Sequence, residues 1–171
     1  MMIQAIARGL LGLTLIAGGM TLPTPQVAQA QESGLAVGTK APSAMVHTLD
    51  GKAVDLAEIA KGPAVIEFWA TWCENCEALL PSMKRASAAY GKKVKFVAVA
   101  VSVNQSVARV KAHVAKYGVP GEQVFDTKGD ATGKWDVPAT SYVVVLDKAG
   151  KVVYSGVGGD QDIEKAVKKA L

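Results

Sequence analysis

The sequence predicts an α/β domain in which helices flank a mixed central sheet. Continuous apolar runs at 64–70 and 94–101 are typical of strands that are buried on both faces of a sheet. A segment with a helical pattern of apolar residues follows each run. This alternation of strands and helices is typical of a layered α/β fold.

The first thirty residues are predicted to be a targeting segment that lies outside the fold. Residues 1–8 carry one positive charge and no acid, and the apolar stretch at 9–22 is shorter than the about 20 residues that span a membrane. Ala28-Gln29-Ala30 supplies the small residues that a signal peptidase requires. We therefore expect a signal peptide at 1–30, a flexible linker at 31–37 and the folded domain at 38–171. An uncleaved N-terminal anchor is the alternative.

The domain is expected to begin with a β-hairpin. Strands at 44–49 and 52–56 flank Asp50-Gly51, a dipeptide that favours a two-residue hairpin turn. The elements expected after it are a short helix at 56–60, the buried strand at 64–70, and a helix at 73–90 that ends at Gly91 and Lys92.

The second half of the domain is expected to begin with the buried strand at 94–101. Asn104 can cap the next helix, whose apolar positions are Val107, Val110, Val114 and Tyr117. Gly118 and Pro120 end that helix. The remaining elements are a strand at 123–126, a short helix at 129–135, a hairpin of strands at 141–147 and 151–155, and an amphipathic helix that begins at Asp160 or Asp162.

The two cysteines of the chain lie together where the first buried strand turns into a helix, in the stretch Trp69-Ala70-Thr71-Trp72-Cys73-Glu74-Asn75-Cys76. A helix N-terminus offers unpaired N–H groups and a partial positive charge, which favour a thiolate over a thiol. Because a thiolate attacks disulfides, the placement predicts thiol–disulfide exchange. Cys73 is expected to be the exposed nucleophile, and Cys76, one turn further on, the resolving thiol. Glu74 places a negative charge beside the thiolate, which favours a reductant.

Glu67 is an acid inside an apolar strand, six residues before Cys73. A lone buried carboxyl tends to stay protonated. If Glu67 lies close to Cys76, it can take or give the proton that the resolving thiol exchanges. The structural alternative is that Glu67 reaches a lysine or a strand end and has no chemical role.

Val137-Pro138-Ala139-Thr140 precedes the apolar strand at 141–147. Pro138 cannot donate a hydrogen bond to a neighbouring strand, and a cis peptide bond there would expose the backbone of Val137 to an extended substrate. A trans turn is the default for the sequence alone. Trp72 either covers the sulfurs and docks a partner or packs against the domain.

Composition excludes several other functions. The net charge is +4 and the lysines are scattered, without a basic run interleaved with aromatic residues, so nucleic acid is not an expected partner. Two cysteines and two distant histidines are a poor match to a zinc site, so no metal and no cofactor are expected. In an oxidising compartment, a lone C-x-x-C pair favours a redox role over a structural one.

These motifs resemble those of the thioredoxin superfamily, and more narrowly its exported TlpA/ResA-like branch. The resemblance covers 38–171 and rests on the Gly-Thr-Lys-Ala-Pro segment with its hairpin, on Phe-Trp-Ala-Thr-Trp-Cys-Glu-Asn-Cys, on the helix inserted after Val101, and on Val-Pro-Ala-Thr. It implies a thioredoxin-like fold, with Cys73 as nucleophile, Cys76 as resolving thiol, Pro138 as a cis proline facing the disulfide, and Glu67 in the place of the buried acid of thioredoxin.

The resemblance also implies partners and a location. Proteins of this branch are generally periplasmic reductants that a membrane thiol carrier keeps reduced, and they typically act on apocytochrome c or on copper-site cysteines. We therefore expect a monomer that binds protein disulfides through Trp72, Glu74 and Val137. The chain departs from the branch at Leu79, where the ResA type often has an acid, so a strict apocytochrome specialism does not follow.

Three other functions remain open at this point. A thiol peroxidase shares the fold, but its cysteine follows P-x-x-x-T-x-x-C and Ala70 stands here at the threonine position. A Cu(I)-binding chaperone would use the same two cysteines. A disulfide-forming oxidant would differ from a reductant only in its reduction potential.

Overall fold

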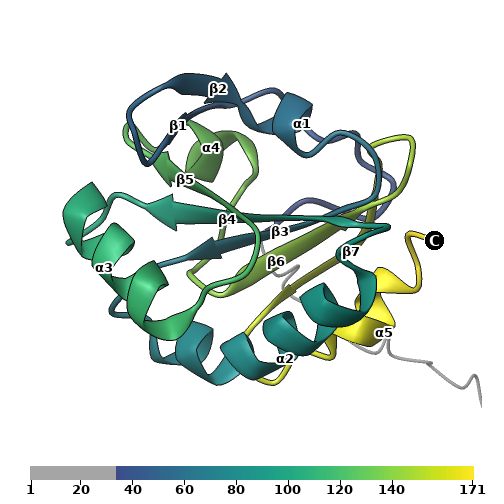
Figure 1. Ribbon diagram of the computed structural model, residues 1–171. Coiled ribbons are helices and arrows are strands. Elements are labelled where there is room, and N and C mark those ends of the chain that lie inside the picture. The colour runs from purple at the N-terminus through teal and green to yellow at the C-terminus, as the bar shows by residue number, and fades with distance from the viewer. Residues whose placement is uncertain (1–33) are drawn as a thin grey trace, which may run out of the picture. The chain divides into compact units, whose positions relative to one another are not determined.

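Seven strands form one mixed sheet in the computed structural model, which describes residues 34–171 (Figure 1). The predicted signal peptide, and residues 31–33 of the predicted linker, lie outside the described residues. No helix in the described part of the chain is both long enough and apolar enough to cross a membrane. The strands are β1 (Met45–Thr48), β2 (Ala53–Asp55), β3 (Ala64–Trp69), β4 (Lys95–Val101), β5 (Glu122–Asp126), β6 (Tyr142–Leu146) and β7 (Val152–Val157).

The strand order across the sheet is β2-β1-β5-β4-β3-β6-β7. β3, β4 and β5 run parallel to one another, whereas β1 pairs antiparallel with β5 and β6 pairs antiparallel with β3. All six residues of β3 are buried, which explains why this segment is apolar at nearly every position. The mixed α/β sheet and both hairpins are confirmed.

Four helices lie between strands in the described residues: α1 (Leu56–Ile59), α2 (Glu74–Tyr90), α3 (Val107–Tyr117) and α4 (Asp130–Lys134). A fifth, α5 (Ile163–Val167), follows the last strand. α2 and α5 lie together on one face of the sheet, where Leu79 and Met83 of α2 join Ile163 and Val167 of α5 in one core cluster (Figure 1).

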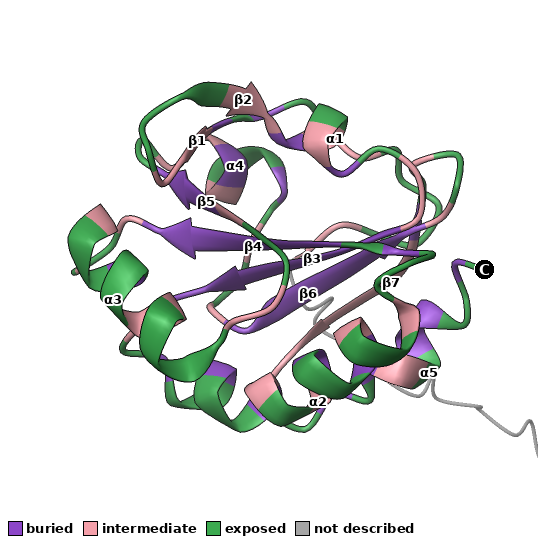
Figure 2. Cartoon of the chain, in the orientation of Figure 1, coloured by how far each residue is buried: buried purple, intermediate pink, exposed green. Residues whose placement is uncertain are grey.

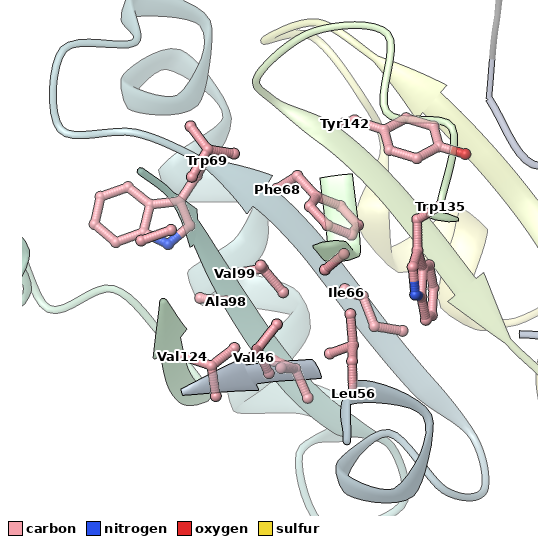
Figure 3. Packing of buried hydrophobic residues seen from close by; sticks show 14 of the residues in the cluster. Val46, Leu56, Ile66, Phe68, Trp69, Ala98, Val99, Val124, Trp135 and Tyr142 are labelled. Carbon is pink, nitrogen blue, oxygen red and sulfur yellow. The ribbon is translucent and has the colours of Figure 1, made fainter. Parts of the chain in front are cut away.

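A second core cluster fills the other face of the sheet and contains buried residues of α1, α3 and α4. Figure 2 shows that the strands in the middle of the sheet are buried along most of their length, while the outward surfaces of α2 and α3 are exposed. Phe68 of β3 lies next to Trp135 and Tyr142 in this cluster, with ring centroids 5.8 and 6.0 Å away (Figure 3). The core thus holds the strand that leads into the cysteine pair.

The N-terminus of α3 differs from the prediction. Ser106, and not Asn104, caps the helix, because the Ser106 hydroxyl accepts a hydrogen bond from the Arg109 N–H at 3.3 Å. Asn104 instead has a left-handed backbone with φ 54° in the turn before the helix. The predicted end is confirmed, since Gly118 closes the helix with φ 64°.

Residues at the start of the described chain form hydrogen bonds with β6, with β7 and with the loop before β6. The Leu35 N–H donates to the Tyr142 hydroxyl at 2.7 Å, and the Gly34 N–H donates to Asp136 at 3.1 Å. Gly38 donates to the carbonyl of Val152 in β7. The described end of the segment predicted as a linker therefore makes specific contacts with the sheet and the loop before it.

Candidate active site

Cys73 and Cys76 form a disulfide at the point where β3 ends and α2 begins, with Cα atoms 5.2 Å apart. Cys73 is the N-cap residue of α2, and its sulfur accepts a hydrogen bond from the Cys76 N–H at 3.1 Å. This N–H belongs to the first turn of the helix and also donates to the Cys73 carbonyl at 3.1 Å, so the two acceptors share it. The same contact would stabilise a thiolate on Cys73 once the disulfide is reduced.

The two cysteines are more alike in exposure than the sequence predicts. Cys73 is 9% exposed and Cys76 is 6% exposed, so in the disulfide form neither sulfur stands out in solvent. The difference between them lies in hydrogen bonding, because it is the Cys73 sulfur that accepts the backbone N–H. The proposed order of attack rests on this contact and not on exposure.

A pocket of about 130 Å³ lies against the disulfide and contains the buried acid. Glu67 of β3 lines this pocket together with both cysteines. The residue is 3% exposed, and burial raises the pKa of its carboxyl from 4.5 to about 8. The alternative in which Glu67 pairs with a lysine has no support among the described residues, since no salt bridge there includes it.

Three glutamates surround the disulfide. Glu74 and Glu77, both in the first turn of α2, line the pocket with Glu67. Among the described residues that line it, none is a lysine or an arginine. Negative charges near a sulfur disfavour its thiolate, so Glu74 and Glu77 oppose the stabilisation that the helix N-terminus gives to Cys73, whereas the buried Glu67 is protonated.

His113 of α3 also lines this pocket, a position that the sequence does not reveal. It is half-buried between Trp69 and Tyr117, with ring centroids 5.2 and 4.4 Å away. Burial lowers the pKa of its imidazole, while Glu77 raises that pKa and Lys116 lowers it. The helical pattern of α3 places His113 on the side of Tyr117, but nothing in the sequence indicates that this side meets the cysteines.

Trp72 lies on the surface beside the disulfide. Its indole N–H donates to the carbonyl of Val103 at 2.8 Å, and 46% of the residue is exposed. The preceding residue is also hydrogen-bonded to the loop after β4: the backbone N–H of Thr71 donates to the Gln105 side chain at 2.9 Å. The loop after β4 thus fixes the loop that carries the cysteines. Residues at the ends of parallel strands often build a site, and that is the signal by which Val103 and Gln105 could have been noticed.

Val137 and Pro138 line a groove of about 460 Å³ together with Trp72 and Val103. The structure therefore places Pro138 and Trp72 along one groove, which neither cysteine lines, whereas the resemblance implies that Pro138 faces the disulfide. The expected cis peptide bond is wrong, because all described peptide bonds are trans. The physical reason is the ordinary preference for trans, which cis overcomes in only about 5–6% of X–Pro bonds. Glu74 does not line this groove; it lines the pocket that contains Glu67.

No group of three or more His, Cys, Asp or Glu side chains in residues 34–171 is arranged to hold a metal ion. The site contains a disulfide that can be reduced, a backbone donor on one sulfur, and a buried carboxyl of raised pKa in the pocket that both cysteines line. This set of groups suits thiol–disulfide exchange, in which one sulfur attacks or leaves and a nearby acid exchanges a proton.

Comparison of this chain with known proteins identifies relatives that are named for thiol–disulfide exchange. The Redoxin family matches residues 36–171. The thiol–disulfide oxidoreductase ResA of Bacillus subtilis (strain 168) is 28% identical over 148 residues, which are 86% of this chain and 81% of the relative. The thioredoxin-like protein YneN of the same organism is 29% identical over 129 residues, 75% of each chain.

Solved structures share the fold. A thiol:disulfide interchange protein of the thioredoxin family from Chlorobium tepidum TLS has a TM-score of 0.65 at 26% identity, over 80% of this chain and 98% of that one. A secreted disulfide oxidoreductase of Mycobacterium tuberculosis, homologous to DsbE of E. coli, has a TM-score of 0.62 at 26% identity, over 72% and 93% of the two chains. The predicted thioredoxin-like fold is confirmed.

Proposed function

Because this chain belongs to the Redoxin family and is a thiol–disulfide oxidoreductase of the thioredoxin superfamily, we propose that it works as an exported reductant of protein disulfides. In this role the reduced Cys73 attacks a client disulfide and forms a mixed disulfide. Cys76 then attacks Cys73, which releases the reduced client and leaves the disulfide seen in the structure.

The observation that carries the direction of electron flow is the charge around the disulfide. Glu67, Glu74 and Glu77 line the pocket, and no lysine or arginine is among the described residues there. A strong oxidant depends on a very stable thiolate in its reduced form. Because the buried Glu67 is protonated, the charge comes from Glu74 and Glu77. Their carboxylates make a nearby thiolate less stable, which favours the disulfide and makes the dithiol a better electron donor.

The groove that contains Trp72, Val137 and Pro138 is the proposed docking place for an extended client segment. Trp72 and Val103 are 46% and 58% exposed and provide an apolar rim. The resemblance to the TlpA/ResA-like branch suggests clients such as apocytochrome c or copper-site cysteines, with a membrane thiol carrier as the electron donor and a monomer as the acting form.

Export to the periplasm is supported by the N-terminal sequence, with its single arginine, apolar stretch and Ala-Gln-Ala site. One structural neighbour is itself a secreted disulfide oxidoreductase. In an oxidising compartment a reductant needs a dedicated donor, because the surroundings would otherwise hold its cysteines as a disulfide.

The test is the reduction potential of the Cys73–Cys76 couple, measured on purified protein equilibrated with graded thiol/disulfide buffers. We expect a value near or below the roughly −270 mV of thioredoxin. A value near the about −120 mV of a strong oxidant would reverse the proposed direction and make the chain a disulfide donor.

A further inference from the structure

His113 lies between the buried pocket and the surface. It lines the pocket of about 130 Å³ that holds Glu67 and the disulfide, and it also lines an outer groove of about 350 Å³ on the solvent side of α3. Arg109 and Lys116 line the outer groove and not the inner pocket. The imidazole is therefore placed where a proton passing between Glu67 and solvent would cross.

The inner pocket also contains a polar group without a protein partner. The indole N–H of Trp69 is buried and makes no hydrogen bond, although Trp69 lines the pocket and packs against His113 with the ring planes inclined by 46°. A buried donor without a partner is costly, so this N–H is suited to hold water. Water there would give Glu67 and His113 a hydrogen-bonded connection without direct contact.

The titratable and charged groups that line the two pockets with His113 come from three elements, the cysteines apart. Glu67 belongs to β3, Glu74 and Glu77 belong to α2, and Arg109, Lys116 and Tyr117 belong to the same helix as His113. Burial lowers the pKa of His113, with Glu77 and Lys116 acting in opposite directions. A neutral imidazole has a free nitrogen that can accept a proton at neutral pH, as a relay requires.

We propose that His113 is a proton-relay residue, which carries protons between the buried Glu67 carboxyl and solvent during each redox cycle. It acts through Glu67 and not on the sulfurs themselves. The inference rests on the proposed function, because it concerns the resolving step of the same exchange reaction.

Resolution of the mixed disulfide reduces the client. Glu67, which is protonated at rest, first passes its proton through His113 to solvent and becomes a carboxylate. The Cys76 thiol then gives its proton to this carboxylate while its sulfur forms a bond to Cys73. The bond between Cys73 and the client sulfur breaks, and the client sulfur leaves as a thiolate with the electron pair. The dithiol is oxidised, the client disulfide is reduced and Glu67 is protonated again; the path runs in reverse when a donor thiol reduces the enzyme.

The experiment follows reduced full-length mature protein as it reacts with an aromatic disulfide that releases a coloured thiolate. The first release reports attack by Cys73, and the second reports the resolving attack by Cys76. We expect His113→Gln to leave the first release unchanged and to slow the second roughly tenfold at neutral pH, with an altered pH profile. His47→Gln is the matched control, since His47 is the other histidine of the chain and lines neither pocket.

Two further measurements separate a relay from a packing effect. Added imidazole should restore the second release in His113→Ala, and it should have no effect in the double variant with Glu67→Gln. The inference is overturned if His113→Gln leaves the second release and its pH profile unchanged, or if its effect persists in the Glu67→Gln background. Failure of the proposed reductant role appears in a different measurement, the reduction potential of the Cys73–Cys76 couple, so the two failures are distinguishable.

Discussion

Glu67 has a proposed role in the exchange reaction and an expected effect on stability, and both follow from its burial. Its carboxyl is almost fully buried, and burial alone accounts for the rise of its pKa to about 8. A protonated acid can give a proton to the Cys76 sulfur as that sulfur leaves, and its conjugate base can take the proton back. An amide at the same place would fit the pocket but could do neither.

The same residue predicts a pH dependence of stability. Below pH 4.5 the Glu67 carboxyl is protonated in the folded and in the unfolded chain. Between 4.5 and about 8 the unfolded chain loses this proton while the folded chain keeps it. The free energy of unfolding therefore falls as the pH rises through this window, by up to roughly 1.4 kcal/mol per pH unit from this group.

Denaturant unfolding of the oxidised protein at a series of pH values measures this contribution. Glu67→Gln should flatten the decline between pH 5 and 8, because the amide does not titrate. Glu58→Gln changes an exposed acid on α1 and should keep the wild-type dependence. Parallel curves for wild type and Glu67→Gln would show that the buried carboxyl does not carry the effect.

Residues of the site were predictable from the sequence when they lie close together along the chain. Cys73, Cys76 and Glu67 fall within ten positions of one another, so a strand followed by a helix is enough to place them. His113 and Val103 reach the site from the loop and helix after β4. Their roles follow from strand pairing and from the packing of α3, which local patterns do not encode.

At the scale of elements, the turn before α3 shows why a cap is harder to predict than a helix. Asn104 and Ser106 are both good N-cap residues. The structure uses the later one, since the Asn104 backbone is left-handed and its carbonyl accepts from the Arg109 guanidinium at 3.3 Å. Most other elements begin and end within two residues of their predicted bounds, because apolar runs, glycines and caps mark them in the sequence.

The choice of cap can be tested by substitution. Ser106→Ala should lower the free energy of unfolding by about 1 kcal/mol, because it removes the acceptor for the Arg109 N–H. Asn104→Gly should cause no such loss, since glycine adopts a positive φ without strain. Urea denaturation of both variants decides the point, and a larger loss at Asn104 would assign the cap to that residue.

At the scale of the whole molecule, the sheet determines where the site can lie. β3, β4 and β5 are parallel, and the loops that follow β3 and β4 hold the cysteines, Trp72 and Val103 at one end of the sheet. The sequence predicts the strands but not their order. β1 pairs with β5, about 75 positions away along the chain, and no local pattern specifies such a partner.

Amide hydrogen exchange should distinguish the central strands of the sheet from the segment bound at its edge. Amides of β3, β4 and β6 are expected to exchange most slowly, because these strands are paired on both sides or buried throughout. Amides at 34–41, which connect to the edge of the sheet, should exchange faster. Mass spectrometry of peptic fragments measures both, and protection at 34–41 equal to that of β3 would mean that this segment unfolds only with the whole domain.

The position of Trp72 has a practical consequence. The indole directly precedes Cys73 and is held by its hydrogen bond to Val103, so it stays beside the sulfurs. Disulfides quench the emission of neighbouring indoles, and the quenching ends when the bond is reduced. The intrinsic fluorescence of the chain thus contains an optical signal of its own oxidation state. Electron transfer to or from a partner can be followed in real time, with no dye attached and no residue changed.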